Sequence, residues 1–267
     1  RLMSRGLGDV YKRQMLFRPI RMLADRFNTL QMGMVSSARV FDLLDNDEII
    51  HQSGNNQLES FNGQISFKNV HFSYDGRSKV FDGLSLDVRS GETIAVVGPT
   101  GAGKTSLINL ISRYYEFQEG EILLDGMDIR SISLSSLRSK VAVVLQDVFL
   151  FNTSVLENIT LGKEEIELEQ VIEAAKKVGV HGFISQLDGS YEFQVKERGG
   201  VLSSGQRQLI SFLRAYICKP DLLILDEATS SVDSGAEELI QKATKVITKD
   251  RTSIIIVEKI EYLRKET

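Results

Sequence analysis

The sequence has one cysteine, three histidines and no long uninterrupted apolar run. With Cys218 alone, no disulfide can form within the chain, which excludes a disulfide-stabilised secreted scaffold and favours a reducing compartment. No apolar run reaches the roughly 18 residues that indicate a membrane-spanning helix. Positive charge is not in excess, because 32 Lys and Arg face 36 Asp and Glu. This balance counts against a nucleic-acid-binding protein.

The amino-acid composition is that of a folded protein. The 267 residues are 42% hydrophobic and 25% charged, which is an ordinary composition for one or two globular domains with a sizeable core.

The first fourteen residues, RLMSRGLGDVYKRQ, differ from the rest of the chain. They show no clean helical or alternating period and lack the apolar centre of a secretory signal. The string resembles translated sequencing-adapter read-through, so we interpret residues 1–14 as a non-native, assembly-derived segment.

Residues 15–46 have a helical apolar period. The stripe consists of Leu16, Ile20, Leu23, Phe27, Leu30, Met34, Phe41 and Leu44. A helix that starts at Pro19, where a first turn tolerates proline, and ends at Leu44 would be roughly 40 Å long. Such a helix either packs on its own domain or forms a stalk whose stripe another chain or domain covers. The polar tract that follows predicts a linker over residues 47–63.

A phosphate-binding loop follows a short apolar strand at 93–97. Residues 98–105, GPTGAGKT, match G-x-x-x-x-G-K-[ST], and a helical pattern follows at once. Glycines let backbone N–H groups approach phosphate oxygens, and the helix N-terminus adds a positive dipole. Lys104 is suited to reach the β- and γ-phosphates, and the Thr105 hydroxyl is suited to bind Mg²⁺.

The second half of this predicted site lies far downstream. Residues 222–227, LLILDE, form an apolar strand that ends in two carboxylates. Asp226 is placed to hold Mg²⁺ directly or through water, and Glu227 is placed to polarise an attacking water.

A third segment, VLSSGQRQL at 201–209, discriminates among phosphate-loop proteins. Ser203 is a candidate N-cap for a helix over 206–217. Here the sequence resembles the nucleotide-binding domain of ATP-binding-cassette (ABC) transporters. LSSGQ is similar to that family's signature LSGGQ, with Ser204 in place of the first glycine. The resemblance covers about residues 64–257.

The resemblance implies a set of site residues. Those expected to bind ATP are Tyr74, Gly98, Pro99, Thr100, Gly101, Ala102, Gly103, Lys104, Thr105 and Ser106. Those expected to act in catalysis are Lys104, Gln146 and Glu227, and those expected to hold Mg²⁺ are Thr105, Gln146 and Asp226. The signature residues Leu202, Ser203, Ser204, Gly205 and Gln206 are expected to serve the site of a second subunit, and Asp233 is expected in the loop that contacts it.

The resemblance also implies a mechanism and partners. Two nucleotide-binding domains pair head to tail around two ATP molecules, and hydrolysis loosens the pair. The domain works with a transmembrane domain of the same exporter, at the cytoplasmic side of the cell (inner) membrane. The helix at 15–46 resembles the cytoplasmic end of the last transmembrane helix of an exporter half-transporter. We predict an ATPase that drives export and binds no nucleic acid.

One position departs from the family pattern. ABC domains place a histidine after the last core strand, and here that position is Glu258. A carboxylate at neutral pH only accepts hydrogen bonds and would repel the γ-phosphate. Either Glu258 is native and the site hydrolyses ATP poorly, or the sequence is in error near its end. We also expect that the domain, assigned to 64–267, is truncated at its C-terminus.

Other functions remain open at this stage: a nucleotide-binding but hydrolysis-deficient ABC domain, a soluble ABC ATPase of chromosome maintenance or repair, or an importer subunit. The gap between the two halves of the site shows no sustained heptads, which disfavours the second.

The expected fold is α/β with a phosphate-loop NTPase core. We expect a mostly parallel sheet near 93–97, 141–145, 222–226 and 252–257. An antiparallel β subdomain near 64–90 and an inserted helical subdomain at about 147–217 complete it, preceded by the long amphipathic helix.

Overall fold

The computed structural model describes residues 2–45, 54–58, 61–226 and 234–258. The chain divides into two compact units, residues 1–50 and 51–267, each of which is described by itself.

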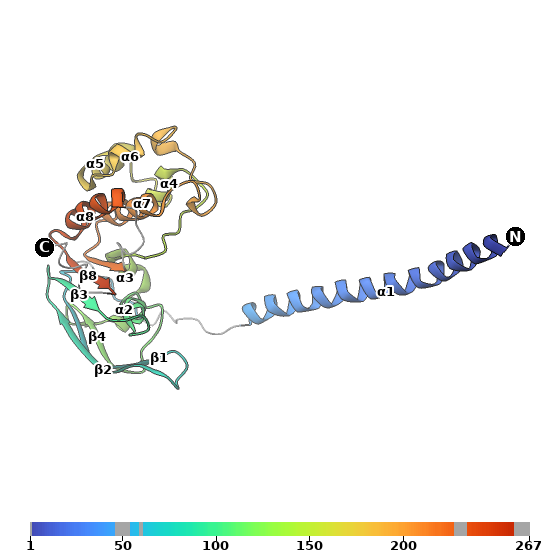
Figure 1. Cartoon of the computed structure of the whole chain (residues 1–267). Coiled ribbons are helices and arrows are strands. Elements are labelled where there is room, and N and C mark those ends of the chain that lie inside the picture. Colours follow the sequence, from blue (N-terminus) through green and yellow to red (C-terminus); the bar gives the residue numbers. More distant parts are fainter. Residues whose placement is uncertain (1, 46–53, 59–60, 227–233, 259–267) are drawn as a thin grey trace. The chain divides into compact units, whose positions relative to one another are not determined.

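The first unit is one helix, α1, at Leu2–Leu44 (Figure 1). It starts earlier than the expected Pro19, which instead lies inside the helix. Leu, Met, Arg, Lys and Gln in the early turns are good helix formers, so residues before Pro19 extend the helix despite the N–H that proline lacks. None of the described helices, α1 included, combines the length and apolar character that a membrane crossing requires.

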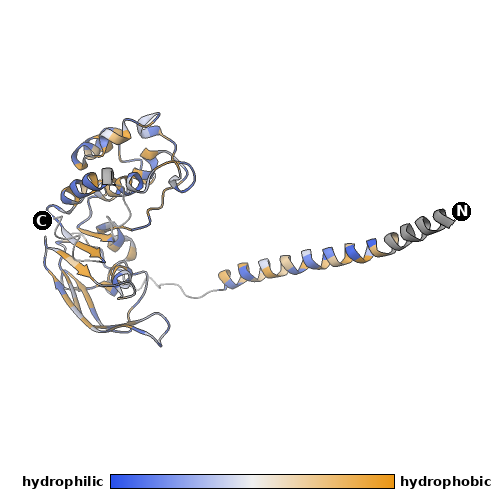
Figure 2. Ribbon diagram, viewed as in Figure 1, coloured by the Kyte–Doolittle hydropathy of each residue, from blue (hydrophilic) through white to orange (hydrophobic). Residues whose placement is uncertain are grey.

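The apolar side chains of α1 are not confined to the predicted stripe. Phe27, Leu30 and Phe41 of the stripe are exposed, but so are Met32 and Leu43 from other faces. Blue and orange residues alternate along the helix in Figure 2. A helix with apolar residues on several faces can bury all of them only when more than one neighbouring element packs against it.

The core of the second unit is a parallel sheet in the order β3-β8-β7-β6. Its strands are β3 (Thr93–Val97), β6 (Val141–Val144), β7 (Leu222–Asp226) and β8 (Thr252–Val257). The two central strands are almost completely buried, as their uninterrupted apolar runs predict. This confirms the four predicted strands, to within one residue at the end of β6.

An antiparallel sheet has the order β2-β1-β4-β5. Its strands are β1 (Ile65–Ser73), β2 (Lys79–Val88), β4 (Glu119–Leu124) and β5 (Met127–Asp128). It extends beyond the predicted 64–90 because β4, which is distant in sequence, pairs with β1, from Ile65 opposite Leu124 to His71 opposite Glu119.

The remaining helices complete the unit. Those near the sheets are α2 (Lys104–Ile111), η1 (Ile129–Ser131) and α3 (Leu134–Lys140). The predicted insertion contains α4 (Val155–Thr160), α5 (Leu168–Val178), α6 (His181–Ile184), η2 (Ser190–Glu192), η3 (Glu197–Gly199) and α7 (Ser204–Ile217), and α8 (Ser234–Thr248) follows β7. Figure 1 shows α4 to α7 grouped on one side of this unit and β1, β2 and β4 on the other.

Two apolar clusters hold these parts. One joins the insertion to α8 and one face of β7 and β8, with Val171, Phe212 and Leu223 among its buried members. The other joins the opposite face of the same strands to α2 and the antiparallel sheet, with Ile108 and Ile224 buried in it. The alternating faces of β7 thus connect both clusters.

The predicted linker differs from the structure in its described part. Asn56 exchanges backbone hydrogen bonds with the Ser131–Ser133 segment, and Leu58 and Phe61 are buried in the second cluster. These two apolar side chains make the polar tract part of the folded unit. Residues 46–53 and 59–60 lie outside the described residues.

Candidate functional site

The loop between β3 and α2 carries the predicted phosphate-binding residues. Gly101 has a φ of 84° and Gly103 a φ of 90°, a left-handed conformation that favours glycine. A Cβ on Gly103 would lie 3.0 Å from the Phe81 ring and 3.2 Å from Val80. Glycine therefore fits this position for two reasons, its backbone angle and the close approach of β2.

Lys104 folds back along the loop. Its ammonium donates to the carbonyl oxygens of Gly98 at 2.6 Å and Pro99 at 3.1 Å. The backbone N–H of Ala102 also donates to the Pro99 carbonyl. These bonds hold a positive charge at the start of α2, where the helix dipole is also positive.

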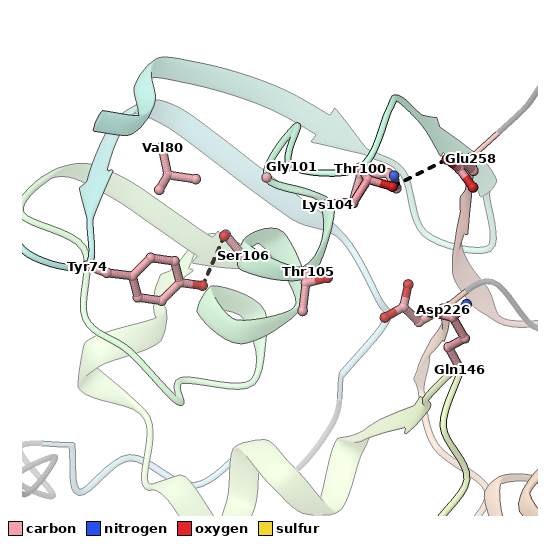
Figure 3. A pocket seen from close by; sticks show the side chains of 11 residues that line it. Tyr74, Val80, Thr100, Gly101, Lys104, Thr105, Ser106, Gln146, Asp226 and Glu258 are labelled. Atoms are coloured by element: carbon pink, nitrogen blue, oxygen red, sulfur yellow. Dashed lines mark hydrogen bonds between the residues drawn. The ribbon is translucent and has the colours of Figure 1, made fainter. Parts of the chain in front are cut away.

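A cavity of about 500 Å³ lies over this loop (Figure 3). Residues from distant parts of the sequence meet there. Its lining consists of Tyr74, Val80, Thr100, Gly101, Gly103, Lys104, Thr105, Ser106, Gln146, Asp226 and Glu258. Ten of these are predicted site residues, whereas Gly98, Pro99 and Ala102 belong to the loop without lining the cavity. The fold therefore brings together the loop, the strand ends and Tyr74.

Tyr74 lies beside the start of α2. Its hydroxyl donates to the Ser106 hydroxyl at 2.9 Å and accepts from the Asn109 amide at 3.0 Å. Its ring packs edge-on against Phe72 and Tyr115, each with centroids 4.7 Å apart. The side chain is 48% exposed, so part of the ring is open to a ligand.

The turn after Tyr74 is held by Asp75. Its carboxylate accepts from the backbone N–H groups of Ser78 and Arg77, both at 2.8 Å. These bonds, that of Ser78 foremost, hold the pKa of Asp75 below its ordinary value.

Oxygen-bearing side chains gather at the carboxyl end of the parallel sheet. Asp226 ends β7, Gln146 follows β6, and Thr105 lies in the first turn of α2. Figure 3 shows Asp226 and Gln146 beside each other and across the cavity from Thr105. Glu227 and Asp233, which the sequence predicts as catalytic base and dimer contact, lie outside the described residues.

Glu258 directly follows β8 and lines the same cavity. The Thr100 hydroxyl donates to its carboxylate at 3.3 Å. The predicted switch position is therefore at the phosphate loop, with a carboxylate where the family pattern has histidine.

The signature segment begins α7. Ser203 is the N-cap: its hydroxyl accepts from the N–H of Gln206 at 3.2 Å, and the Gln206 side chain accepts from the N–H of Ser203 at 2.9 Å. Leu202 and Gly205 are buried, and Ser204 is the first helical residue. None of the five lines the cavity described above.

The loop before the signature is unusual in its backbone. Lys196 and Arg198 have φ angles of 56° and 52°, and Gly199 one of 69°. Non-glycine residues held at positive φ cost free energy and concentrate at functional sites.

Val80 lines the cavity but was not predicted. It lies at the start of β2, whose burial shows no regular alternation. An apolar residue without a motif gives no signal in a single sequence.

Comparisons with known proteins identify the family. A match to the family described as "ABC transporter" covers residues 81–230. The chain is 45% identical to the ABC transporter ATP-binding protein YknV of Bacillus subtilis, over 94% of this chain and 42% of that protein. It is 44% identical to a fatty acid ABC transporter ATP-binding/permease protein of Mycobacterium bovis, over 92% of this chain and 39% of that protein. It is 39% identical to an ATP-dependent lipid A-core flippase of Syntrophus aciditrophicus, over 94% and 42%. The chain thus spans about two fifths of the length of these relatives.

A solved structure agrees. The chain matches a bacterial Atm1-family ABC exporter with ATP bound, with a TM-score of 0.77 and 34% identity, over 94% of this chain and 44% of that one. The matches include ATP-binding/permease proteins, and they do not support the alternative of a hydrolysis-deficient domain. ATP-binding domains of this family are ATPases coupled to transport. The chain belongs to the ABC transporter family and carries the ATP-binding domain of its exporter-type members.

Proposed function

We propose that this chain is the ATP-hydrolysing motor of a membrane exporter, in which two such domains close head to tail around ATP. The observation that carries the proposal is the convergence of Tyr74, the phosphate loop, Gln146 and Asp226 on one cavity. The half-exposed Tyr74 ring stacks on adenine, and the loop with Lys104 holds the phosphates.

Mg²⁺ fits the donors at this cavity. The Thr105 hydroxyl, the Gln146 amide and the Asp226 carboxylate offer oxygen atoms, which Mg²⁺ prefers, and this ion keeps several waters and substrate phosphate oxygens as further ligands. Bound there, Mg²⁺ would neutralise charge on the phosphates. Glu227, one residue after Asp226, orients the attacking water.

The second subunit supplies the signature. The N-terminus of α7, with Ser203, Ser204 and Gly205, faces the γ-phosphate held by the other chain's loop, and Asp233 contacts that chain. The N-terminus of a 14-residue helix is a suitable partner for an anion. Because each chain offers one loop and one signature, a twofold pair contains two complete sites.

The transmembrane partner is the remainder of the exporter. The relatives include ATP-binding/permease proteins, and α1 exposes apolar side chains on several faces. We infer that α1 is the stalk toward the membrane part, and that this domain lies at the cytoplasmic side of the cell membrane. The strained loop at Lys196–Gly199 is suited to contact that part.

Sedimentation of two variants tests the head-to-tail pair. Glu227→Gln removes the carboxylate that orients water, so ATP persists and the variant should sediment as a dimer in Mg-ATP. Lys104→Ala loses the charge that holds the phosphates and should remain monomeric, with ATP affinity at least tenfold lower, which corresponds to about 1.4 kcal/mol.

ADP in place of ATP is the control, and it should leave Glu227→Gln monomeric. A Glu227→Gln dimer that forms equally without nucleotide would contradict the role of ATP in the pair. Unchanged ATP affinity of Lys104→Ala would contradict the assignment of the phosphate loop.

A further inference from the structure

A second cavity, of about 570 Å³, lies at the amino end of the parallel strands, whereas the phosphate loop lies at their carboxyl end. Lys219 and Arg251 line it, just before β7 and β8 begin, and the first residues of these strands are paired in the sheet. Asp226 and Glu258, at the other ends of the same strands, line the cavity over the phosphate loop, called the ATP cavity below. The two cavities share no lining residue.

Positive charge prevails in this second cavity. Three cationic side chains line it from three separate segments of the chain: Lys177 in α5, Lys219 between α7 and β7, and Arg251 just before β8. Glu173 of α5 is the one carboxylate among the lining residues. A concave surface with such a charge balance attracts anions.

Arg251 is positioned by an aromatic ring. Its guanidinium lies over the Tyr216 ring, 5.7 Å from the centroid. Its Nη1 is buried without a hydrogen-bond partner among the described residues, and burial lowers the pKa of the guanidinium. A buried donor without an acceptor is costly, but this nitrogen is closed off from the cavity, so a ligand there can contact only the rest of the side chain.

Two nearby acids, Asp221 and Asp250, attract the Arg251 guanidinium electrostatically. Asp221 and Asp250 line a separate cavity of about 250 Å³, which also touches Lys219 and Arg251. Asp221 is paired with the Lys140 ammonium at 3.1 Å. Neither aspartate lines the larger cavity, whose own lining has three cations and one carboxylate.

Apart from Gln170, the rest of the wall is mainly apolar. Tyr216 and Ile217 of α7 and Ile166 before α5 contribute to it. Cavities that bind small molecules combine an apolar wall with a few convergent polar groups, and this one adds cations at one side. We propose that it binds a small organic anion in which an apolar or aromatic body carries a phosphate or carboxylate group.

Titration of isoleucine methyl groups tests the site, with phenyl phosphate and phenylacetate as probes. Saturating Mg-ADP fills the phosphate loop beforehand. The methyl resonances of Ile166 and Ile217 should then shift in a saturable manner, whereas that of Ile108, buried in α2 beneath the phosphate loop, should not. The tighter of the two probes identifies the anionic group.

Charge variants provide the decisive comparison. Lys177→Gln combined with Lys219→Gln should weaken binding about tenfold, because two exposed cations that line the cavity are lost. Glu173→Gln should tighten it. Lys176→Gln is the matched control, since Lys176 is exposed on the same helix but does not line the cavity. No saturable shift at Ile166 and Ile217, or equal affinity in the double variant and the control, would overturn the proposal.

Discussion

The helices α2 and α7 begin at the two segments assigned to ATP, and they begin in different ways. At α2 the N-cap is Gly103, in a left-handed conformation and without a side-chain cap. At α7 the N-cap is Ser203, which forms a complete capping box with Gln206. The N-cap of α2 has no side chain that could accept a hydrogen bond from the first turn, whereas the N-cap of α7 has one and uses it.

This difference matches the proposed roles. An α-helix has N–H groups in its first turn that it cannot satisfy itself. At α2 a phosphate is the proposed acceptor, and a capping side chain would compete with it. At α7 the capping box keeps the helix start formed when no second subunit is present. Ser204 lies inside this helix, which explains why a glycine is not required there.

Among the variants that test this difference between α2 and α7, Gly103→Ala should lower stability and ATP affinity the most. Alanine is strained at a φ of 90°, and its Cβ would press on Phe81 and Val80. We expect a loss of about 1–3 kcal/mol in the free energy of unfolding, measured by urea denaturation. The displaced loop should also bind ATP at least about tenfold more weakly in a fluorescent-nucleotide competition assay.

Two glycine variants separate the causes. Gly101→Ala keeps the strain, at a φ of 84°, but its Cβ would meet no atom of the described residues within 4 Å. It should lose less stability than Gly103→Ala. Gly182→Ala in α6 has neither problem and should change stability by less than about 1 kcal/mol. Equal losses at Gly103 and Gly101 would mean that contact with β2 is unimportant.

Ser203→Ala should lower the free energy of unfolding by an intermediate amount. It removes the acceptor for the Gln206 N–H and should cost about 1 kcal/mol of unfolding free energy. Because Ser203 does not line the ATP cavity of its own chain, affinity for ATP in the monomer should not change.

Ser203→Asn is the control for this prediction, since asparagine is an equally good N-cap. Its stability should stay near that of the original chain. If Ser203→Ala weakens ATP binding in a monomer, the signature contributes within one chain and the head-to-tail proposal is wrong.

The regular parts of the fold were predictable for a physical reason. The buried strands β7 and β8 consist of continuous apolar runs, and the phosphate loop follows β3 at once. The pairing of β4 with β1 was missed, because it depends on chain segments far apart. The early start of α1 was missed because Pro19 is a strong local signal for a helix start.

The residues of the candidate site also fall into two groups, those that sequence motifs predict and those that only packing brings to the site. Lys104, Thr105 and Asp226 belong to linear motifs, and the fold brings them to one cavity. Val80 and the close approach of Phe81 to Gly103 have no linear signature, since they depend on how β2 packs over the loop. That Nη1 of Arg251 has no hydrogen-bond partner among the described residues likewise follows from packing alone.

Tyr74→Phe should lower the free energy of unfolding the least. It removes the hydrogen bonds to Ser106 and Asn109, which hold the first turns of α2 from outside. The partly exposed position limits the cost to about 0.5–1 kcal/mol of unfolding free energy. The ring and its contacts with Phe72 and Tyr115 remain, so ATP affinity should be kept, whereas Tyr74→Ala should lose it. If the two variants lose ATP affinity equally, the hydroxyl acts through the start of α2, and the open helix start depends on Tyr74 as well as on Gly103.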